Sequence, residues 1–122
     1  MRKITFSLFA LVIFLCGCDS KTKEVSPLSE DKIYFFYYNE CPYCHKAIEY
    51  IDKKYPNLNM AMVNIYVGNG FELFKKCGQK FNLGNNMGTP LFCMGDKFLM
   101  GWSDTNAQRF DEYVQPFLKT SK

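Results

Sequence analysis

The sequence lacks several features that identify common classes of protein. It has one histidine and no second Cys-x-x-Cys pair, so the ligands and spacing of a tetrahedral zinc site are missing. Lysine and arginine are dispersed among acidic residues and the formal net charge is only +3, which argues against nucleic-acid binding. The apolar run at residues 4–15 is shorter than the roughly 20 residues that a membrane-spanning helix needs. Internal repeats and low-complexity segments are also missing.

The residues that are present fit a single small globular domain. Of the 122 residues, 48% are hydrophobic and 17% aromatic, which is enough to form a packed core. Six cysteines occur at uneven spacings, and this apolar content can build a core without covalent links. The cysteines therefore do not indicate a disulfide scaffold.

The first residues have the pattern of a bacterial targeting segment. Two basic residues precede the apolar run, which ends in Leu15–Cys18 (Leu-Cys-Gly-Cys) and resembles the lipobox of bacterial lipoproteins. We expect residues 1–17 to be a lipoprotein signal peptide and Cys18 to become the lipidated N-terminus. A plain secretory signal and an uncleaved anchor are the alternatives. Asp19 adds the hypothesis of retention in the inner membrane.

The residues that follow Cys18 predict a flexible tether. Residues 18–31 are mostly polar, and a flexible chain of this length spans roughly 20 Å on average. The folded domain, predicted over residues 32–122, would then lie close to the membrane. We therefore expect a lipid-anchored protein of the bacterial cell envelope, on the periplasmic or extracytoplasmic face.

One Cys-x-x-Cys pair, Cys41 and Cys44, lies between a predicted strand and a predicted helix. Apart from Lys32, residues 32–38 are aromatic or aliphatic, typical of a strand buried on both faces, and residues 43–55 are amphipathic. At a helix N-terminus, this spacing allows a disulfide, and the unpaired N–H groups and helix dipole stabilise a thiolate. The pattern predicts thiol–disulfide exchange, with Cys44 pointing inward and Cys41 exposed at the helix start.

The rest of the chain predicts an α/β fold in the order β-α-β-α-β-β-α. Apolar periodicity and turn residues predict strands at 60–67, 91–94 and 97–102 and a helix over 71–81. A last helix follows, for which Ser103, Asp104 and Thr105 are all competent N-caps, and Thr105 with Gln108 fits a capping box. Pro116 should kink or end this helix.

Three short motifs give residues 32–118 a resemblance to a known superfamily. They are Cys41-Pro42-Tyr43-Cys44, Gly88-Thr89-Pro90 and Gly101-Trp102-Ser103-Asp104. The first is identical to the commonest glutaredoxin active-site sequence, and the others resemble the cis-proline segment and the glycine-then-acid turn. The chain therefore resembles the thioredoxin-like superfamily, and glutaredoxins most closely. This resemblance implies a mixed four-stranded sheet flanked by three helices.

The resemblance also implies a role for each matched residue. Cys41 would be the nucleophile and Cys44 the resolving thiol. Thr89 would offer its backbone to an extended substrate, and Pro90 would follow a cis peptide bond. The remaining implied site residues are Pro42 and Tyr43 in the active-site motif and Ser103 and Asp104 as glutathione contacts. Glutathione would be a co-substrate, and no bound cofactor is expected.

Glu40 departs from the glutaredoxin pattern. Glutaredoxins usually place a basic or small polar residue shortly before the first cysteine. A carboxylate there disfavours both a thiolate and an anionic tripeptide. We therefore expect protein dithiols and disulfides as partners, together with a membrane redox protein that resets the site. A glutathione-dependent glutaredoxin is the alternative.

Other residues raise further alternatives. Cys77 and Cys93 fall in apolar patterns, and we expect two buried thiols, with a disulfide between them as the alternative. Five methionines, with the Cys-x-x-Cys-His site, suggest envelope soft-metal (copper) binding or delivery as a second function. A docking module with a vestigial motif is a third. Of these functions, the sequence favours a membrane-tethered thiol–disulfide oxidoreductase that uses Cys41 and Cys44.

Overall fold

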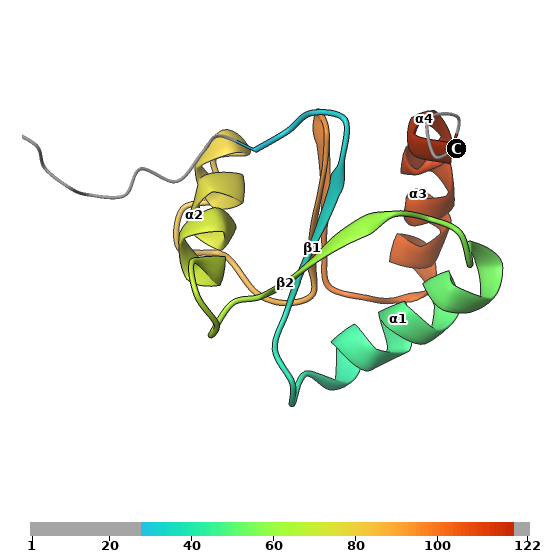
Figure 1. The fold of residues 1–122 in the computed structure, drawn as a ribbon, viewed down its shortest axis with the longest axis horizontal. Coiled ribbons are helices and arrows are strands. Elements are labelled where there is room, and N and C mark those ends of the chain that lie inside the picture. The colour runs from blue at the N-terminus through green and yellow to red at the C-terminus, as the bar shows by residue number, and fades with distance from the viewer. Residues whose placement is uncertain (1–27, 119–122) are drawn as a thin grey trace, which may run out of the picture.

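A computed structural model describes residues 28–118, whose four strands form one mixed sheet (Figure 1). The strand order is β2-β1-β3-β4. Strand β1 (Ile33–Tyr37) runs parallel to β2 (Met60–Asn64) and antiparallel to β3 (Leu91–Met94). Strand β4 (Lys97–Met100) pairs antiparallel with β3. Because β1 and β2 are parallel, their carboxyl ends lie at the same edge of the sheet.

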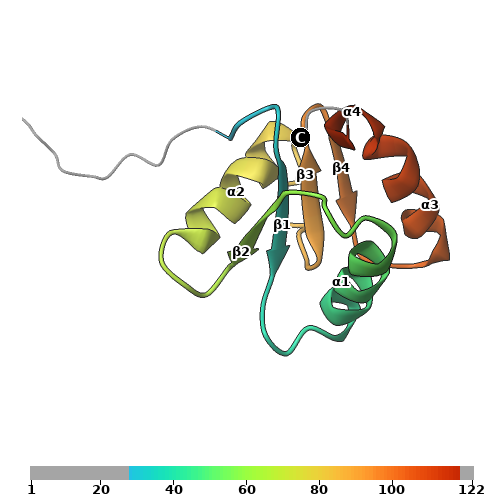
Figure 2. The same ribbon diagram turned by 45° about the vertical axis from the view of Figure 1, so that its right-hand side comes forward.

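Helices cover both faces of this sheet. Helix α2 (Gly70–Lys80) lies on one face, and α1 (Pro42–Lys54) and α3 (Asp104–Tyr113) lie on the other (Figures 1 and 2). A short helix, α4 (Gln115–Leu118), follows α3. Alternate residues of β1 supply the two cores: Ile33 and Phe35 pack with Ile51 and Phe110, and Tyr34 and Phe36 pack with Phe74 and Cys77. Strand β1 is therefore buried on both faces, as predicted.

The predicted fold class and element order are confirmed, and several boundaries differ. Strand β2 ends at Asn64, because the chain turns away to reach α2, and β4 ends at Met100. Ser103 caps α3 by accepting a hydrogen bond from the Asn106 N–H at 3.1 Å. Since α3 already begins at Asp104, the predicted Thr105 capping box is wrong. The helix breaks at Val114, two residues before Pro116.

Several predictions concern residues outside the described part of the chain. They are the signal peptide at 1–17, the lipidation of Cys18 and most of the tether at 18–31. Within residues 28–118, no helix has the length and apolar character that a bilayer crossing requires.

The prediction of two free thiols at Cys77 and Cys93 is wrong. These residues form a disulfide, with Cα atoms 6.1 Å apart, that joins α2 to β3. Both are buried, at 0% and 2% exposed. The sequence correctly predicts that each cysteine lies on an apolar face, but it holds no information on the distance between these two faces. The disulfide therefore fastens α2 to the centre of the sheet.

A polar network on Asp111 joins α1 to α3. Asp111 accepts hydrogen bonds from the Tyr50 hydroxyl at 2.8 Å, the Lys54 ammonium at 2.9 Å and the Tyr55 hydroxyl at 2.7 Å. Burial alone would raise the pKa of Asp111, but these bonds outweigh it and hold that pKa below its usual 3.8. Burial and the bond to Asp111 raise the pKa of Tyr55 to about 12. The ionised carboxylate is therefore the form that holds the helices together.

Replacing Asp111 with asparagine should lower the free energy of unfolding at pH 7 by about 1 kcal/mol, since a partly exposed charged acceptor is lost. A depressed carboxyl pKa contributes stability that is full above the unfolded pKa, about 3.9, and disappears as the pH falls through the folded pKa. The gap between wild type and Asp111→Asn should therefore close below about pH 3. Urea unfolding of both proteins at pH 7 and below about pH 3 measures this difference in the free energy of unfolding. Asp52→Asn, on the exposed face of α1, is the control, and an equal loss there would contradict the assignment.

Candidate redox-active site

The two cysteines of the motif form a disulfide at the start of α1. Their Cα atoms are 5.2 Å apart. Cys41 is the N-cap residue of α1, and Pro42 occupies its first turn, where a missing N–H costs no hydrogen bond. The first turn of α1 contains no acidic side chain. The positive end of the helix therefore acts directly on the sulfur of Cys41.

Two donors point at the Cys41 sulfur. The Cys44 backbone N–H lies 3.2 Å from Cys41 Sγ, and the Thr89 hydroxyl donates to the same atom at 3.3 Å. The predicted cis bond between Thr89 and Pro90 is confirmed. Pro90 is buried. The segment before β3 thus lies directly against the disulfide, as the resemblance implied.

Both cysteines are buried, which corrects one prediction. Cys41 is 3% exposed and Cys44 1%. The predicted inward position of Cys44 is confirmed, but the predicted exposure of Cys41 is wrong, because the Thr89 side chain reaches its sulfur from another part of the chain. Tyr43, between the cysteines, is 55% exposed. The accessible surface next to the disulfide therefore includes the exposed Tyr43 and the half-buried Thr89.

The charged groups near the disulfide are at the surface. Glu40 is exposed, and His45 makes a hydrogen bond between its Nε2 and the Asn39 carbonyl at 2.8 Å. Within residues 28–118 no charged side chain is buried. Proton transfer to and from Cys44 must therefore use water or a surface group, since no buried acid lies in the described domain.

The predicted substrate residues Ser103 and Asp104 lie at the same end of the β3–β4 pair as Pro90. The register pairs Leu91 with Met100, and the Gly101 N–H donates to the Pro90 carbonyl at 2.8 Å. Both residues are exposed, but the Ser103 hydroxyl is already used to cap α3. The turn is therefore brought beside the cis-proline segment, with the Asp104 carboxylate facing solvent.

Two asparagines at the site were missed by the sequence analysis. The Asn64 side-chain amide donates to the Asn39 side-chain oxygen at 3.3 Å, which joins the loop before Cys41 to the end of β2. Asn64 also accepts a hydrogen bond from the Tyr66 N–H at 2.9 Å. Asparagine is common in loops, so only the adjacency of the β1 and β2 carboxyl ends pointed to this pair.

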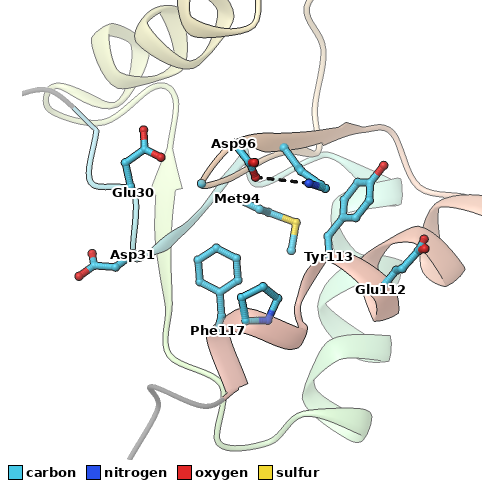
Figure 3. A pocket seen from close by; sticks show the side chains of 10 residues that line it. Glu30, Asp31, Met94, Asp96, Glu112, Tyr113 and Phe117 are labelled. Carbon is cyan, nitrogen blue, oxygen red and sulfur yellow. Dashed lines mark hydrogen bonds and ion pairs between the residues drawn. The ribbon is translucent and has the colours of Figure 1, made fainter.

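A pocket of about 420 Å³ lies at the opposite end of the sheet (Figure 3). The turn of the β3–β4 hairpin and the residues before β1 line it, whereas the disulfide follows the far end of β1. Met94, Tyr113 and Phe117 supply its apolar lining, and the Glu30 and Asp31 carboxylates point outward (Figure 3). Among residues 28–118, no three His, Cys, Asp or Glu side chains are grouped as a metal site. The Cys41–Cys44 disulfide is not part of the lining of this pocket.

The topology and the site together define a thioredoxin-like fold. A mixed sheet in the order β2-β1-β3-β4 carries a Cys-x-x-Cys disulfide at the start of α1, opposite a cis-proline. Cys41 and Cys44 form on this fold a disulfide-bonded Cys-x-x-Cys pair, an arrangement that suggests thiol–disulfide redox activity.

Comparisons with known proteins add one structural likeness. No family model matches the chain, and no curated protein sequence matches it. A crystal structure of the glutaredoxin grx-1 from Archaeoglobus fulgidus is similar, at 17% identity and a TM-score of 0.48, over 64% of this chain and 83% of that one.

Thr89 is expected to increase the reactivity of Cys41. In the reduced protein, Thr89→Val would remove one of the two donors to the Cys41 sulfur and so lower its thiolate fraction. A hydrogen bond to a charged acceptor is worth about 1.5 kcal/mol, so alkylation by iodoacetamide at mildly acidic pH should slow about tenfold. Thr105→Val, on the exposed surface of α3, should alkylate like wild type. An unchanged rate in Thr89→Val would mean that the helix start alone holds the thiolate.

Proposed function

We propose that this protein is a dithiol thiol–disulfide oxidoreductase that exchanges disulfides with proteins of the bacterial cell envelope. The observation that carries the proposal is the Cys41–Cys44 disulfide at the start of α1, with the Thr89 hydroxyl and a helix N–H on the Cys41 sulfur. These donors stabilise negative charge on one sulfur of the pair, and a thiolate is the attacking and leaving species in exchange.

The exchange runs in two steps. In the reducing direction, the Cys41 thiolate attacks one sulfur of a substrate disulfide, and the other substrate sulfur leaves as a thiolate. Cys44, after losing its proton to water, then attacks Cys41, forms the intramolecular disulfide and releases the second substrate thiolate. Two electrons pass to the substrate, and two protons return to its thiolates. In the oxidising direction the same steps are reversed.

Protein substrates fit the surroundings of the disulfide better than glutathione does. Thr89 makes no backbone hydrogen bond within the described residues, so its N–H and C=O are available to an extended segment. Tyr43 offers an exposed aromatic ring beside that segment. The Glu40 carboxylate repels an anionic tripeptide. Ser103 and Asp104 are the residues that glutathione would meet if it were used.

The membrane tether is part of the proposal and rests on the sequence. Lipid on Cys18 and the polar residues 18–31 would hold the domain near the membrane, where a membrane redox protein resets it. Cys18→Ala should move the protein from the membrane fraction to the soluble fraction. Wild-type protein found in the soluble fraction would exclude the anchor and leave the redox proposal intact.

The reduction potential of the Cys41–Cys44 pair is the experiment that tests the redox proposal and its direction. Glutaredoxins lie at about −200 to −230 mV and the oxidant DsbA at about −120 mV. Equilibration with glutathione buffers gives the value, and reduction of a protein disulfide gives turnover. A value near the glutaredoxins with slow glutathione turnover indicates a reductant of proteins, and a value near −120 mV indicates an oxidant. A pair that does not exchange would refute the proposal.

A further inference from the structure

The longest stretch of the chain without a charged residue lies beside the redox site. It covers residues 55–71, between Lys54 and Glu72, in a chain of which 22% is charged. The described part of the chain has five exposed large hydrophobic side chains, and four of them lie in this segment. These four define the β2 patch: Met62 at 46% exposed, Tyr66 at 73%, Val67 at 64% and Phe71 at 48%. Such a concentration of apolar surface marks an interaction site.

The same segment contains an open sheet edge. Within residues 28–118, β2 pairs with β1 alone, so the outer N–H and C=O groups of β2 face away from the sheet. Proteins commonly protect such edges with lysine or proline, and β2 has neither, whereas the other edge strand, β4, begins with Lys97. A groove of about 380 Å³ lies at the end of β2 and is lined in part by Tyr37, Met62, Val67 and Leu73. The edge can therefore accept a strand, and the groove an apolar side chain.

The β2 patch is continuous with the surroundings of the disulfide. The Tyr66 ring packs edge-on against Tyr38, with centroids 5.6 Å apart, and Asn64 donates to Asn39 at 3.3 Å. Both connections leave the sheet at the same end (Figure 1). A Cβ on Gly70 would lie 2.0 Å from the Asn64 carbonyl oxygen, so the loop is held close to the end of β2. A partner on the patch would therefore also reach the Cys41 side of the molecule.

We propose that the β2 edge and the β2 patch bind an extended, uncharged apolar segment of the substrate protein as an additional strand. This inference rests on the proposed function, because it assigns the segment to the molecule whose disulfide meets Cys41. Unpaired backbone groups select an extended chain, and residues 55–71 offer no charged partner to a charged side chain of that segment. Lys75, whose ammonium lies 5.6 Å from the centre of the Phe71 ring, is a charge next to the patch and is paired with Glu72. The substrate segment bound at β2 therefore flanks the reacting disulfide. The β2 edge and the β2 patch supply affinity for substrates that have unfolded, apolar stretches.

Met62→Lys tests the surface, because it places a charge at the middle of the edge. The variant should lower kcat/KM for a scrambled protein disulfide about tenfold relative to kcat/KM for a small aromatic disulfide, with the change mainly in KM. Gln108→Lys adds the same charge to the exposed surface of α3 and should keep the wild-type ratio. Val67→Ser, which adds no charge, is the second variant in case Met62→Lys fails to fold. It should also lower kcat/KM for the protein disulfide relative to the small disulfide.

Binding without redox chemistry is the second measurement. The probe is a peptide of alternating valine and threonine with one carbamidomethyl-capped cysteine, titrated into the oxidised protein. Wild type should bind it, Met62→Lys should bind it about tenfold more weakly, and a peptide with glutamate in place of threonine should bind weakly to wild type. Binding without exchange activity would refute the proposed function and leave the docking surface standing. The docking proposal would be overturned if Met62→Lys and wild type had the same ratio of kcat/KM for the protein disulfide to kcat/KM for the small disulfide. It would also be overturned if wild type formed a concentration-dependent dimer that Met62→Lys abolishes.

Discussion

Cys44→Ser should accumulate a covalent complex with substrate, and Cys41→Ala should form none. The first step needs only the Cys41 thiolate, which keeps its contacts to the Thr89 hydroxyl and the helix start in the Cys44 variant. The second step needs a sulfur nucleophile at position 44, and a serine hydroxyl cannot replace it at neutral pH. Turnover of a protein disulfide should fall by about a thousandfold or more in both variants.

Non-reducing electrophoresis and mass spectrometry distinguish these two variants. The Cys44→Ser complex should release its substrate with dithiothreitol, and the linked peptide should contain Cys41. The Cys44 N–H at the helix start and the Thr89 hydroxyl both act on the Cys41 sulfur, which makes Cys41 the sulfur expected to attack the substrate. Equal turnover of Cys44→Ser and wild type in the presence of glutathione would contradict the dithiol mechanism and favour a glutathione-dependent one.

Local patterns were sufficient to predict the fold and the reactive pair. The apolar run before Cys41 indicated a strand buried on both faces, and Ile33–Phe36 are buried in the structure. The amphipathic pattern after Pro42 indicated a helix and hence a parallel crossover to β2. The predicted turn at Gly95 and Asp96 joins β3 to β4, where Met94 pairs with Lys97. Each of these signals lies within a few consecutive residues, which is why sequence reasoning found them.

The missed features depend on residues that are far apart in the chain. Cys41 is buried because Thr89 lies against it, 48 residues away. Strand β2 ends early because the chain turns after Asn64, whose carbonyl accepts from the Val67 N–H at 3.2 Å, and the pattern of apolar residues continues through that turn. Asn39 and Asn64 meet only because parallel strands end at the same edge. The Gly88-Thr89-Pro90 motif placed Thr89 near the site but not its side chain on the Cys41 sulfur, and the other two features have no counterpart in periodicity or motif.

The Cys77–Cys93 disulfide is expected to be the largest single contribution to stability among the side-chain links described. It closes a loop over a sequence separation of 16. A loop of that size removes about 3 kcal/mol of chain entropy from the unfolded state in the loop-closure account. Cys77→Ala/Cys93→Ala should therefore lower the free energy of unfolding by about 3 kcal/mol and the midpoint temperature by about 12–24 °C for a domain of this size.

The active-site pair supplies the control for this prediction. In the wild type, the Cys41–Cys44 disulfide closes a sequence separation of only 3, against 16 for Cys77–Cys93. The Cys41→Ala/Cys44→Ala variant should therefore lose about 1.5 kcal/mol less than the Cys77→Ala/Cys93→Ala variant. Urea unfolding of the three proteins without reductant measures the difference. Under native conditions, dithiothreitol should expose two alkylatable thiols, Cys41 and Cys44, because this pair lies at the start of α1 next to the exposed Tyr43, whereas Cys77 and Cys93 lie in the core between α2 and the sheet. Four alkylated cysteines in the unreduced, folded protein would contradict both disulfides. Equal unfolding energies in the Cys77→Ala/Cys93→Ala variant and wild type would mean that packing alone holds α2 on the sheet.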